Sequence, residues 1–340
     1  MPYRTERVEE CFRAGTTRVY NAFAMALHPQ CKTFLDILAA AGGPSLDQLP
    51  LSDARSVARQ LIEFGGPEEP VAHVEDRVIA GPAQPIPVRI YRPVLAEQLP
   101  ALLFFHGGGF VLGDCDTHDR QCRGLANASG CVVIAVDYRL APEHKFPAAA
   151  DDAFDATRYV AMHPTEFGID PTRVAVGGDS AGANLATVVA LMARDRGGPA
   201  LSFQLLIYPV TDFDDDSPSM REYANDHFLT RDLMNWFTSQ YVASVADRRN
   251  PYASPAYATD LHGLPPAMVI TGECDPLRDQ GETYARALQN AGVSVELKRY
   301  EGMIHPFFSL GGLIDGARTA MTDAAAALRR TLKAVAPAGV

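Results

Sequence analysis

The sequence predicts an α/β fold in which helices cover both faces of a mostly parallel central sheet. The main observation is a repeated alternation of short apolar runs of strand length with longer stretches of helical periodicity. The composition agrees, because 47% hydrophobic and 21% charged residues are typical of a well-packed globular protein. A chain of 340 residues is long enough for one large domain with an accessory piece, or for two ordinary domains.

Charge and cysteine content exclude several classes of function. The formal net charge is 30 − 41 = −11 without a basic block, which argues against binding to nucleic acid or anionic membranes. The charged amino terminus lacks a signal-peptide core and no apolar run reaches membrane-spanning length, so we expect a cytoplasmic protein without a stable membrane anchor. The six scattered cysteines indicate free thiols, and pairing of Cys115 with Cys122 stays open.

The first segment, residues 1–65, is predicted to be helical. Apolar residues recur at helical spacing at 19–27 and at 34–38. A further helix with a Ser or Asp cap is indicated at 52–62. Nothing in this segment suggests chemistry. Its apolar faces need a partner, so we expect it to pack onto the residues that follow.

The next residues, 66–211, begin with two strands, at 72–79 and 86–91, that we expect to form an antiparallel pair at a sheet edge. Strands and helices then alternate to the end of the chain. The further strands are expected at 101–105, 131–136, 173–176, 203–208, 267–272 and 293–299. The helices are expected near 117–129, 148–162, 181–194, 277–291 and 316–334.

The interval 212–260 interrupts this alternation, which resumes over 261–340. It contains no core strand, but its residues 228–237 form an amphipathic pattern that includes the single Trp. An insertion at the carboxyl edge of such a sheet lies over the active site and can act as a lid. The acidic cluster at 212–216 departs from a calcium loop, because Ser and Tyr stand where the loop needs Gly and Glu. We interpret it as a solvated turn.

The motif Gly-Asp-Ser-Ala-Gly at 178–182 is the strongest local signal for chemistry. It follows the apolar run 173–176 and leads into an apolar stretch at 184–192 that indicates a buried helix. A strand, a tight glycine turn and a helix are the context in which Gly-x-Ser-x-Gly forms a nucleophile elbow. A side chain at either glycine would block the turn and the close approach of helix and strand. We therefore expect Ser180 to stand at the carboxyl end of its strand.

A serine nucleophile needs a base, and histidine is the residue for this task. In sheets of this type the chain order is Ser, then Asp or Glu, then His. Three histidines follow Ser180, and two of them, His227 and His262, fall within or just after the inserted interval. His305 comes shortly after an apolar run ending at Tyr300, at the carboxyl end of a predicted strand, where such sheets place catalytic groups. We predict His305 as the base.

The orienting acid is predicted by the same reasoning. Asp275 follows the apolar run 267–271 by a few residues, where a strand ends and a helix that starts with Pro begins. Glu273 is a neighbouring competitor, and Asp279 would already lie inside the helix. We expect Asp275 to hold His305 in the tautomer that accepts the serine proton.

The sequence His-Gly-Gly-Gly at 106–109 directly follows a predicted strand. Three successive glycines cost backbone entropy, and a phosphate cradle is one explanation, but neither of the usual glycine-rich phosphate motifs is present. An oxyanion hole is the better explanation. We predict that the N–H groups of Gly107 and Gly108 join that of Ala181 around the developing oxyanion. His106 is expected to anchor the loop.

Together these motifs resemble the bacterial hormone-sensitive-lipase family of carboxylesterases, of the Gly-Asp-Ser-Ala-Gly type, from about residue 70 to the carboxyl end. The resemblance is carried by His-Gly-Gly-Gly at 106–109, Asp-Tyr-Arg-Leu-Ala-Pro-Glu-His at 137–144, Gly-Asp-Ser-Ala-Gly at 178–182, Asp-Pro-Leu-Arg-Asp at 275–279 and Ile-His at 304–305. One departure is Pro306, where the family usually has Gly. Proline restricts the preceding residue, here His305, to extended backbone angles.

The resemblance implies an α/β-hydrolase core, 66–211 and 261–340, under a helical cap made from 1–65 and 212–260. It also implies short- to medium-chain acyl esters as substrates, no cofactor, and an acyl-enzyme on Ser180. Homodimers are common among such proteins. Asp137 and Glu143 would then brace the site without taking part in the chemistry.

Two other functions are compatible with parts of this pattern. Plant gibberellin receptors resemble the family but lack the catalytic His, so the presence of His305 favours an enzyme. A hydrolase of amides or peptides would keep the same three residues, Ser180, Asp275 and His305. The sequence leaves open the acyl length, the alcohol, the enantioselectivity and the biological substrate, because these depend on the shape of the pocket.

Overall fold

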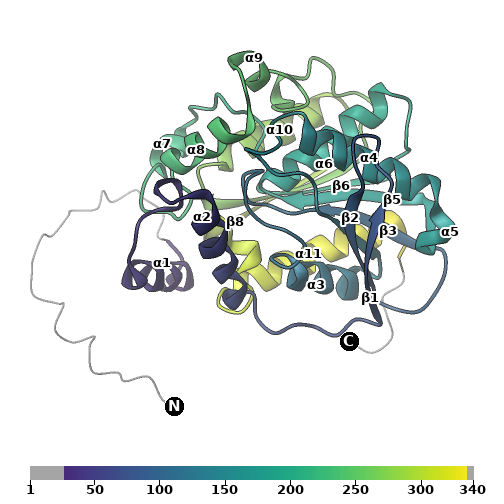
Figure 1. Cartoon of the computed structure of the whole chain (residues 1–340), viewed down its shortest axis with the longest axis horizontal. Coiled ribbons are helices and arrows are strands. Elements are labelled where there is room, and N and C mark those ends of the chain that lie inside the picture. The colour runs from purple at the N-terminus through teal and green to yellow at the C-terminus, as the bar shows by residue number, and fades with distance from the viewer. Residues whose placement is uncertain (1–26, 335–340) are drawn as a thin grey trace, which may run out of the picture.

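One eight-stranded sheet forms the centre of the computed structural model, which describes residues 27–334 (Figure 1). The strands are β1 (His73–Ile79), β2 (Ile86–Arg92), β3 (Leu99–Phe105), β4 (Val132–Val136), β5 (Ile169–Asp179), β6 (Phe203–Ile207), β7 (Ala267–Cys274) and β8 (Val295–Ile304). They lie in the order β1-β2-β4-β3-β5-β6-β7-β8. Strand β2 is antiparallel to both β1 and β4, and all other neighbours are parallel. The antiparallel edge pair and the mostly parallel sheet are confirmed.

Helices cover both faces of this sheet, as expected (Figure 1). The long helices are α3 (Asp119–Ser129), α4 (Ala148–Met162), α6 (Ala181–Asp195), α10 (Arg278–Asn290) and α11 (Asp315–Leu332), and α5 (Pro164–Phe167) is a short turn. Helices α3 and α11 pack together on one face, and α4 and α6 pack together on the other. The predicted α/β class is confirmed. Among residues 27–334, no helix has both the length and the apolar character that a bilayer crossing needs.

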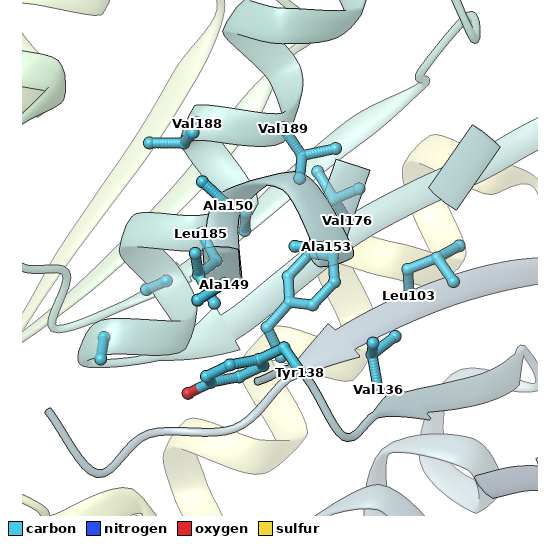
Figure 2. Packing of buried hydrophobic residues seen from close by; sticks show 14 of the residues in the cluster. Leu103, Val136, Tyr138, Ala149, Ala150, Ala153, Val176, Leu185, Val188 and Val189 are labelled. Carbon is cyan, nitrogen blue, oxygen red and sulfur yellow. The ribbon is translucent and has the colours of Figure 1, made fainter. Parts of the chain in front are cut away.

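The core consists of two apolar layers, because successive strand residues point to opposite faces of the sheet. Along β3, Leu103 and Phe105 belong to one buried cluster, and Leu102 and Phe104 belong to the other. Figure 2 shows the first cluster, in which strand side chains meet helix side chains. The labelled residues are Leu103, Val136, Tyr138, Ala149, Ala150, Ala153, Val176, Leu185, Val188 and Val189. The alanines of α4 let that helix approach α6 closely.

Two predicted strand ends move in ways that matter for the site. Strand β5 begins at Ile169 rather than at 173, since Ile169 pairs with Leu99 of β3. Strand β8 runs on past Tyr300 to Ile304, which pairs with Cys274 at the end of β7. His305 is therefore the first residue after β8. The strand predicted from the sequence ends at 299, because residues 301–304, which include a glycine, lack the apolar alternation of a strand.

The first segment forms α1 (Pro29–Ala41), η1 (Leu46–Gln48), α2 (Leu51–Arg59) and η2 (Gln60–Phe64). The predicted helix at 34–38 lies inside α1, and the one at 52–62 continues beyond α2 as a tighter turn. The expected helix at 19–27 lies outside the described residues, apart from its last residue. Phe34 of α1 is fully buried, with its ring 5.2 Å from that of Phe64.

The interval 212–260 holds α7 (Pro218–Glu222), α8 (Arg231–Tyr241), α9 (Val245–Arg248) and η3 (Pro255–Tyr257). The amphipathic helix predicted at 228–237 is α8, but it begins at Arg231. Thr230 ends the preceding loop, because its Oγ1 accepts the N–H of Leu233 at 3.1 Å as a helix cap. Phe228 has a φ of +58° and cannot belong to the helix.

Two further expectations concern the acidic cluster at 212–216 and the pair Cys115 and Cys122. The carboxylates of the cluster at 212–216 accept N–H groups of their own loop and pair with arginines, as expected for a turn. Cys115 and Cys122 are both buried free thiols and do not pair. Burial raises the pKa of each thiol, which disfavours the reactive thiolate form.

Candidate active site

Ser180 lies at the sharp turn between β5 and α6, with φ +55° and ψ −117°. A side chain disfavours this φ, so the surroundings must hold the turn in place. One contact that does so is the Ser180 N–H, which donates to the carbonyl of Ile207 on β6 at 2.8 Å. A Cβ on Gly178 or Gly182 would collide with the carbonyl oxygen of Phe105. Both glycines are therefore required for the close approach of β3, β5 and α6.

The structure brings the three predicted residues into one chain of hydrogen bonds. Ser180 Oγ lies 3.0 Å from His305 Nε2, and His305 Nδ1 lies 2.8 Å from Asp275 Oδ2. With Nδ1–H donating to the carboxylate, Nε2 is the acceptor for the serine hydroxyl. Asp275 is completely buried, and its Oδ1 accepts the N–H of Leu277 at 2.8 Å. The acid is thus held in position by its own turn.

The position of His305 follows from the length of β8. The strand carries it to the carboxyl edge of the sheet, and the 3₁₀ turn η4 (Phe307–Ser309) follows directly. The ring of Tyr208 packs against the imidazole, with 4.4 Å between the ring centroids. Pro306 leaves the imidazole within hydrogen-bond reach of Ser180.

The competing residues lie elsewhere. His227 and His262 are exposed or half-buried, and each binds an oxygen of its own loop. Glu273 and Asp279 each accept a backbone N–H outside the chain of hydrogen bonds, at 2.7 and 2.8 Å. Neither acid contacts His305, so the choice of Asp275 as its partner agrees with the geometry.

The N–H groups of the glycine loop bear on the predicted oxyanion hole. The N–H of Gly107 donates to Asp179 Oδ1 at 2.9 Å, so it is already engaged. The N–H groups of Gly108 and Gly109 donate no hydrogen bond to any residue within 27–334. Ala181 is the first residue of α6, so its N–H has no carbonyl partner within the helix. The amides that remain open to an oxyanion are those of Gly108, Gly109 and Ala181.

Asp179, next to Ser180, ties the glycine loop to the elbow. Its Oδ1 also lies 3.2 Å from Nε2 of His118, whose Nδ1 contacts the Thr117 hydroxyl at 2.9 Å. Burial by itself raises the pKa of the Asp179 carboxyl, but the neighbouring imidazoles, above all that of His118, outweigh it and leave the pKa lowered. Asp179 is therefore a buried carboxylate anion that holds the backbone of Gly107.

His106 anchors the other side of the same loop. Its Nδ1–H donates to the carbonyl of Gly107 at 2.7 Å, and its ring stacks on Tyr138 with centroids 4.3 Å apart. The Tyr138 hydroxyl donates to the carbonyl of His106 at 2.7 Å. Burial and the nearby His118 lower the pKa of His106, so this ring stays neutral. These contacts fit an anchoring role and leave His106 apart from the Ser180 hydroxyl.

The stretch at 137–144 braces the site from outside. Asp137 Oδ1 accepts the N–H of Cys115 at 2.8 Å. Glu143 pairs with Arg55 of α2 at 2.8 Å, and the same guanidinium donates to the carbonyl of Val111 at 3.0 Å. This ion pair is half-exposed and contributes little by itself, but it connects the first segment to the loop after the glycines.

A pocket opens above Ser180, with about 1110 Å³ of empty space that includes open solvent. Its floor includes the glycine loop and the Ser180–His305 pair. Its walls are mainly apolar, and both segments outside the sheet alternation contribute to them, together with residues of the core such as Leu112 and Val210. The wall residues include Ala58, Leu61 and Ile62 from the first segment and Leu233, Met234 and Phe237 from α8.

Sequence reasoning missed the parts played by Asp179 and His118. Asp179 stands in the variable position of Gly-x-Ser-x-Gly, and an acidic side chain at the end of a buried strand was a signal that it needed partners. His118 carried no comparable signal, because its partner is distant in the chain.

Comparisons with known proteins agree with this geometry. A model of the α/β hydrolase fold family matches residues 102–309. The carboxylic ester hydrolase LipN of Mycobacterium tuberculosis is 44% identical over 78% of this chain and 73% of its own length. The carboxylesterase NlhH of the same species is 42% identical over 85% of this chain and 94% of its own length.

Solved structures give the same result. The crystal structure of a thermostable esterase from Pseudomonas putida superposes with a TM-score of 0.88 and 42% identity, covering 91% of this chain and 98% of that chain. The chain belongs to the α/β-hydrolase fold family. The resemblance to hormone-sensitive-lipase-like esterases within it is confirmed.

Proposed function

We propose that this chain hydrolyses esters of short to medium acyl length, with Ser180 as nucleophile, His305 as base and Asp275 as orienting acid. One observation carries the proposal. The Ser180 hydroxyl, the imidazole and the carboxylate form a continuous chain of hydrogen bonds, 3.0 and 2.8 Å long, on the floor of an apolar pocket. An isolated serine hydroxyl would be a weak nucleophile, and this arrangement supplies the base that activates it.

The general class of reaction follows from the family. The chain is a carboxylic ester hydrolase that acts on small ester substrates, like the carboxylesterases and esterases to which it is similar over most of its length. The same nucleophile and base would also suit an amide, but departure of an amine needs stronger protonation of the leaving group. Esters are therefore the substrates that this site cleaves most readily.

The reaction proceeds in two halves. His305 takes the proton of Ser180 as Oγ attacks the ester carbonyl, and Asp275 stabilises the imidazolium that forms. The tetrahedral intermediate collapses as His305 gives its proton to the leaving alcohol, which leaves an acyl-enzyme. Water then enters, His305 takes its proton, and the second collapse returns the acid and free Ser180. Every group in this scheme belongs to the chain, the substrate or water, so the scheme uses no cofactor.

The oxyanion is proposed to rest on the amides of Gly108, Gly109 and Ala181. This set differs from the predicted one in that Gly109 replaces Gly107. The Gly107 N–H already donates to Asp179, and it could donate to the oxyanion only if that hydrogen bond were broken. A donor of this kind is typically worth about 3 kcal/mol of transition-state stabilisation.

Of the predicted segments 1–65 and 212–260, the described residues 27–65 and 212–260 are proposed to form the cap over the described parts of the cores 66–211 and 261–340. Residues from 46–65 and from α8 line the same pocket as Ser180, which supports this division. A cap that lines the pocket mostly with side chains can select the acyl group of the substrate. The shape of the pocket, and not the nucleophile, discriminates between acyl chains of different length.

The decisive experiment compares wild type with Ser180→Ala on 4-nitrophenyl butyrate. We expect kcat to fall by about 10⁴-fold or more, with an unchanged far-UV spectrum and unfolding midpoint. Ser239→Ala, an exposed serine on α8, is the control and should keep full activity. A fluorophosphonate should label wild type at Ser180 alone. Full turnover by the alanine variant would refute the nucleophile, and no labelling would favour a binding protein.

A homodimer and a cytoplasmic location stay predictions from the sequence. Light scattering of the purified chain would test the first, and fractionation of the producing cells would test the second.

A further inference from the structure

One cationic side chain lines the pocket. Among residues 27–334, Arg120 is the single Arg or Lys in the pocket wall that also includes Ser180 and His305. It lies near the start of α3, in a wall that is largely apolar and whose other polar residues include Thr117, Gln121, Thr238 and Ser309.

Arg120 has no ion pair and no hydrogen-bond partner within the described residues, and its Nη1 is fully shielded. Asp119, the residue before it in the chain, is already engaged. Asp119 binds Arg123 at 2.6 Å, and Glu68 binds the same guanidinium at 3.0 Å. Asp179 also lines the pocket, but it is held by Gly107 and a histidine. Arg120 is thus a pocket cation, and both the acid before it in the chain and the acid that lines the same pocket have other partners.

The end of this side chain is held in place. A Cβ on Gly65 would lie 3.0 Å from Arg120 Cδ and 3.5 Å from Nη1, so the guanidinium packs closely against the backbone at the end of the first segment. Gly65 lines the pocket as well. A side chain fixed against backbone has already lost much of its rotamer freedom, so less remains to be lost when it binds a ligand.

A charged group without a partner is unfavourable in a largely apolar wall, and proteins rarely retain one without a use. Nη1 itself is shielded beside Gly65, so a ligand in the pocket would bind the rest of the guanidinium, which also donates no hydrogen bond to a residue within 27–334. The guanidinium carries donors in a planar fork that matches a carboxylate. Apolar surroundings strengthen such a contact, because less water competes for it. The remaining walls would in turn accept the hydrocarbon part of a substrate that carries the carboxylate.

We propose that Arg120 binds a carboxylate on the ester substrate, so that the enzyme favours anionic esters over neutral esters of the same shape. This inference rests on the proposed function, since it assigns a substrate class to that site. The carboxylate can belong to the acyl part, as in a monoester of a dicarboxylic acid, or to the alcohol part, as in an ester of a hydroxy acid. The two sources share the chemistry that Arg120 recognises.

The test uses two matched pairs of substrates. The acyl pair is 4-nitrophenyl hydrogen adipate and 4-nitrophenyl methyl adipate, and the alcohol pair is 4-butyryloxybenzoate and its methyl ester. The variants are Arg120→Met and Arg120→Lys, with Arg158→Met, an exposed arginine on α4, as the control. Rates without enzyme are subtracted, and kcat and KM are measured separately.

We expect Arg120→Met to lower kcat/KM for the anionic member of one pair by about tenfold to hundredfold, through KM. The neutral methyl ester should be unaffected, and Arg120→Lys should retain part of the preference. Sodium chloride should weaken the wild-type preference, since the contact is ionic. The pair that responds identifies whether the acyl or the alcohol part carries the carboxylate.

Two results would overturn the proposal: an equal effect of Arg120→Met on both members of each pair, or no effect on either. If the methionine variant fails to fold, inhibition of the wild-type enzyme tests the proposal instead. Adipate should inhibit it more strongly than dimethyl adipate does, and equal inhibition would contradict the proposal. Hydrolysis of the neutral esters reports separately on the proposed function. Activity on them without any dependence on Arg120 removes this inference and leaves the esterase assignment intact.

Discussion

The floor and the walls of the active site are built in different ways. The floor consists mostly of backbone, in the elbow around Ser180 and the loop at 107–109, and it is held by main-chain hydrogen bonds and by glycines that leave no room for a Cβ. The walls consist mostly of side chains, among them residues of η2 and α8 and the start of α3, and none of these elements is a strand of the sheet.

This difference separates chemistry from selectivity. Attack and oxyanion binding involve the same atoms in every ester, so their positions are set by backbone that few substitutions can alter. The groups on either side of the ester differ between substrates, and they meet side chains that can change without disturbing the sheet. Substitutions in the floor should therefore affect kcat or folding, and substitutions in the walls should affect preference.

The largest effect is expected from Gly182→Ala in the floor. The new Cβ would collide with the carbonyl of Phe105 on β3, and both are backbone groups that cannot move apart cheaply. We expect insoluble protein, or a loss of about 4 kcal/mol or more in the free energy of unfolding with little activity. Gly124→Ala in α3 is the control, because its nearest neighbour is the flexible end of Met321 at 3.4 Å. Similar behaviour of the two variants in urea unfolding would contradict the steric account.

The next effect concerns the carboxylate that holds the glycine loop. Asp179→Ala removes the acceptor of the Gly107 N–H, so the neighbouring oxyanion donors should lose their alignment. We expect kcat on 4-nitrophenyl butyrate to fall by about 100-fold, with a small change in KM. Asp179→Asn keeps an acceptor oxygen and should lose less. Equal losses in kcat for the two variants would show that the charge, and not the hydrogen bond, is what matters.

A smaller effect is expected from Phe237→Ala in the wall. The ring of Phe237 lies directly against Gly109, so its removal enlarges the pocket beside the floor. The ratio of kcat/KM for 4-nitrophenyl hexanoate to that for the acetate should rise by about threefold to tenfold. Asn235→Ala, exposed on the same helix, should leave this ratio unchanged. A general loss of activity on both esters would place Phe237 with the floor instead.

The smallest effect is a dependence of stability on pH. Burial first, and then the nearby His118, lower the pKa of His106 below its ordinary value of 6.5, although Asp137 and Asp179 act in the opposite direction. Between the lowered pKa and 6.5 the unfolded chain binds more protons than the folded one, so the free energy of unfolding should decrease as pH falls below 6.5. Urea midpoints at pH 7.5 and 5.5 should differ less for His106→Asn than for wild type. Equal differences would assign the dependence to other groups.

Much of the fold and of the reacting centre could be predicted from sequence, because the signals are local. The turn around Ser180 requires glycine at 178 and 182 within five consecutive residues. The presence and order of the strands follow from runs of apolar residues. The order of Ser180, Asp275 and His305 along the chain then selects residues at strand ends. Strand and helix ends were less predictable, since β8 extends through pairing with β7 and α8 begins at the Thr230 cap.

The amino-acid sequence by itself thus determined the α/β class and the elbow, and it selected the three residues that we propose as nucleophile, base and acid. Only the tertiary structure decided that the Gly107 N–H donates to Asp179, 72 residues away, and that Arg120 lines the pocket without a partner among the described residues. The physical reason is the range of the forces involved. Backbone turns and apolar periodicity depend on neighbouring residues, whereas a hydrogen bond or an unpaired charge depends on which distant groups folding brings within a few ångströms.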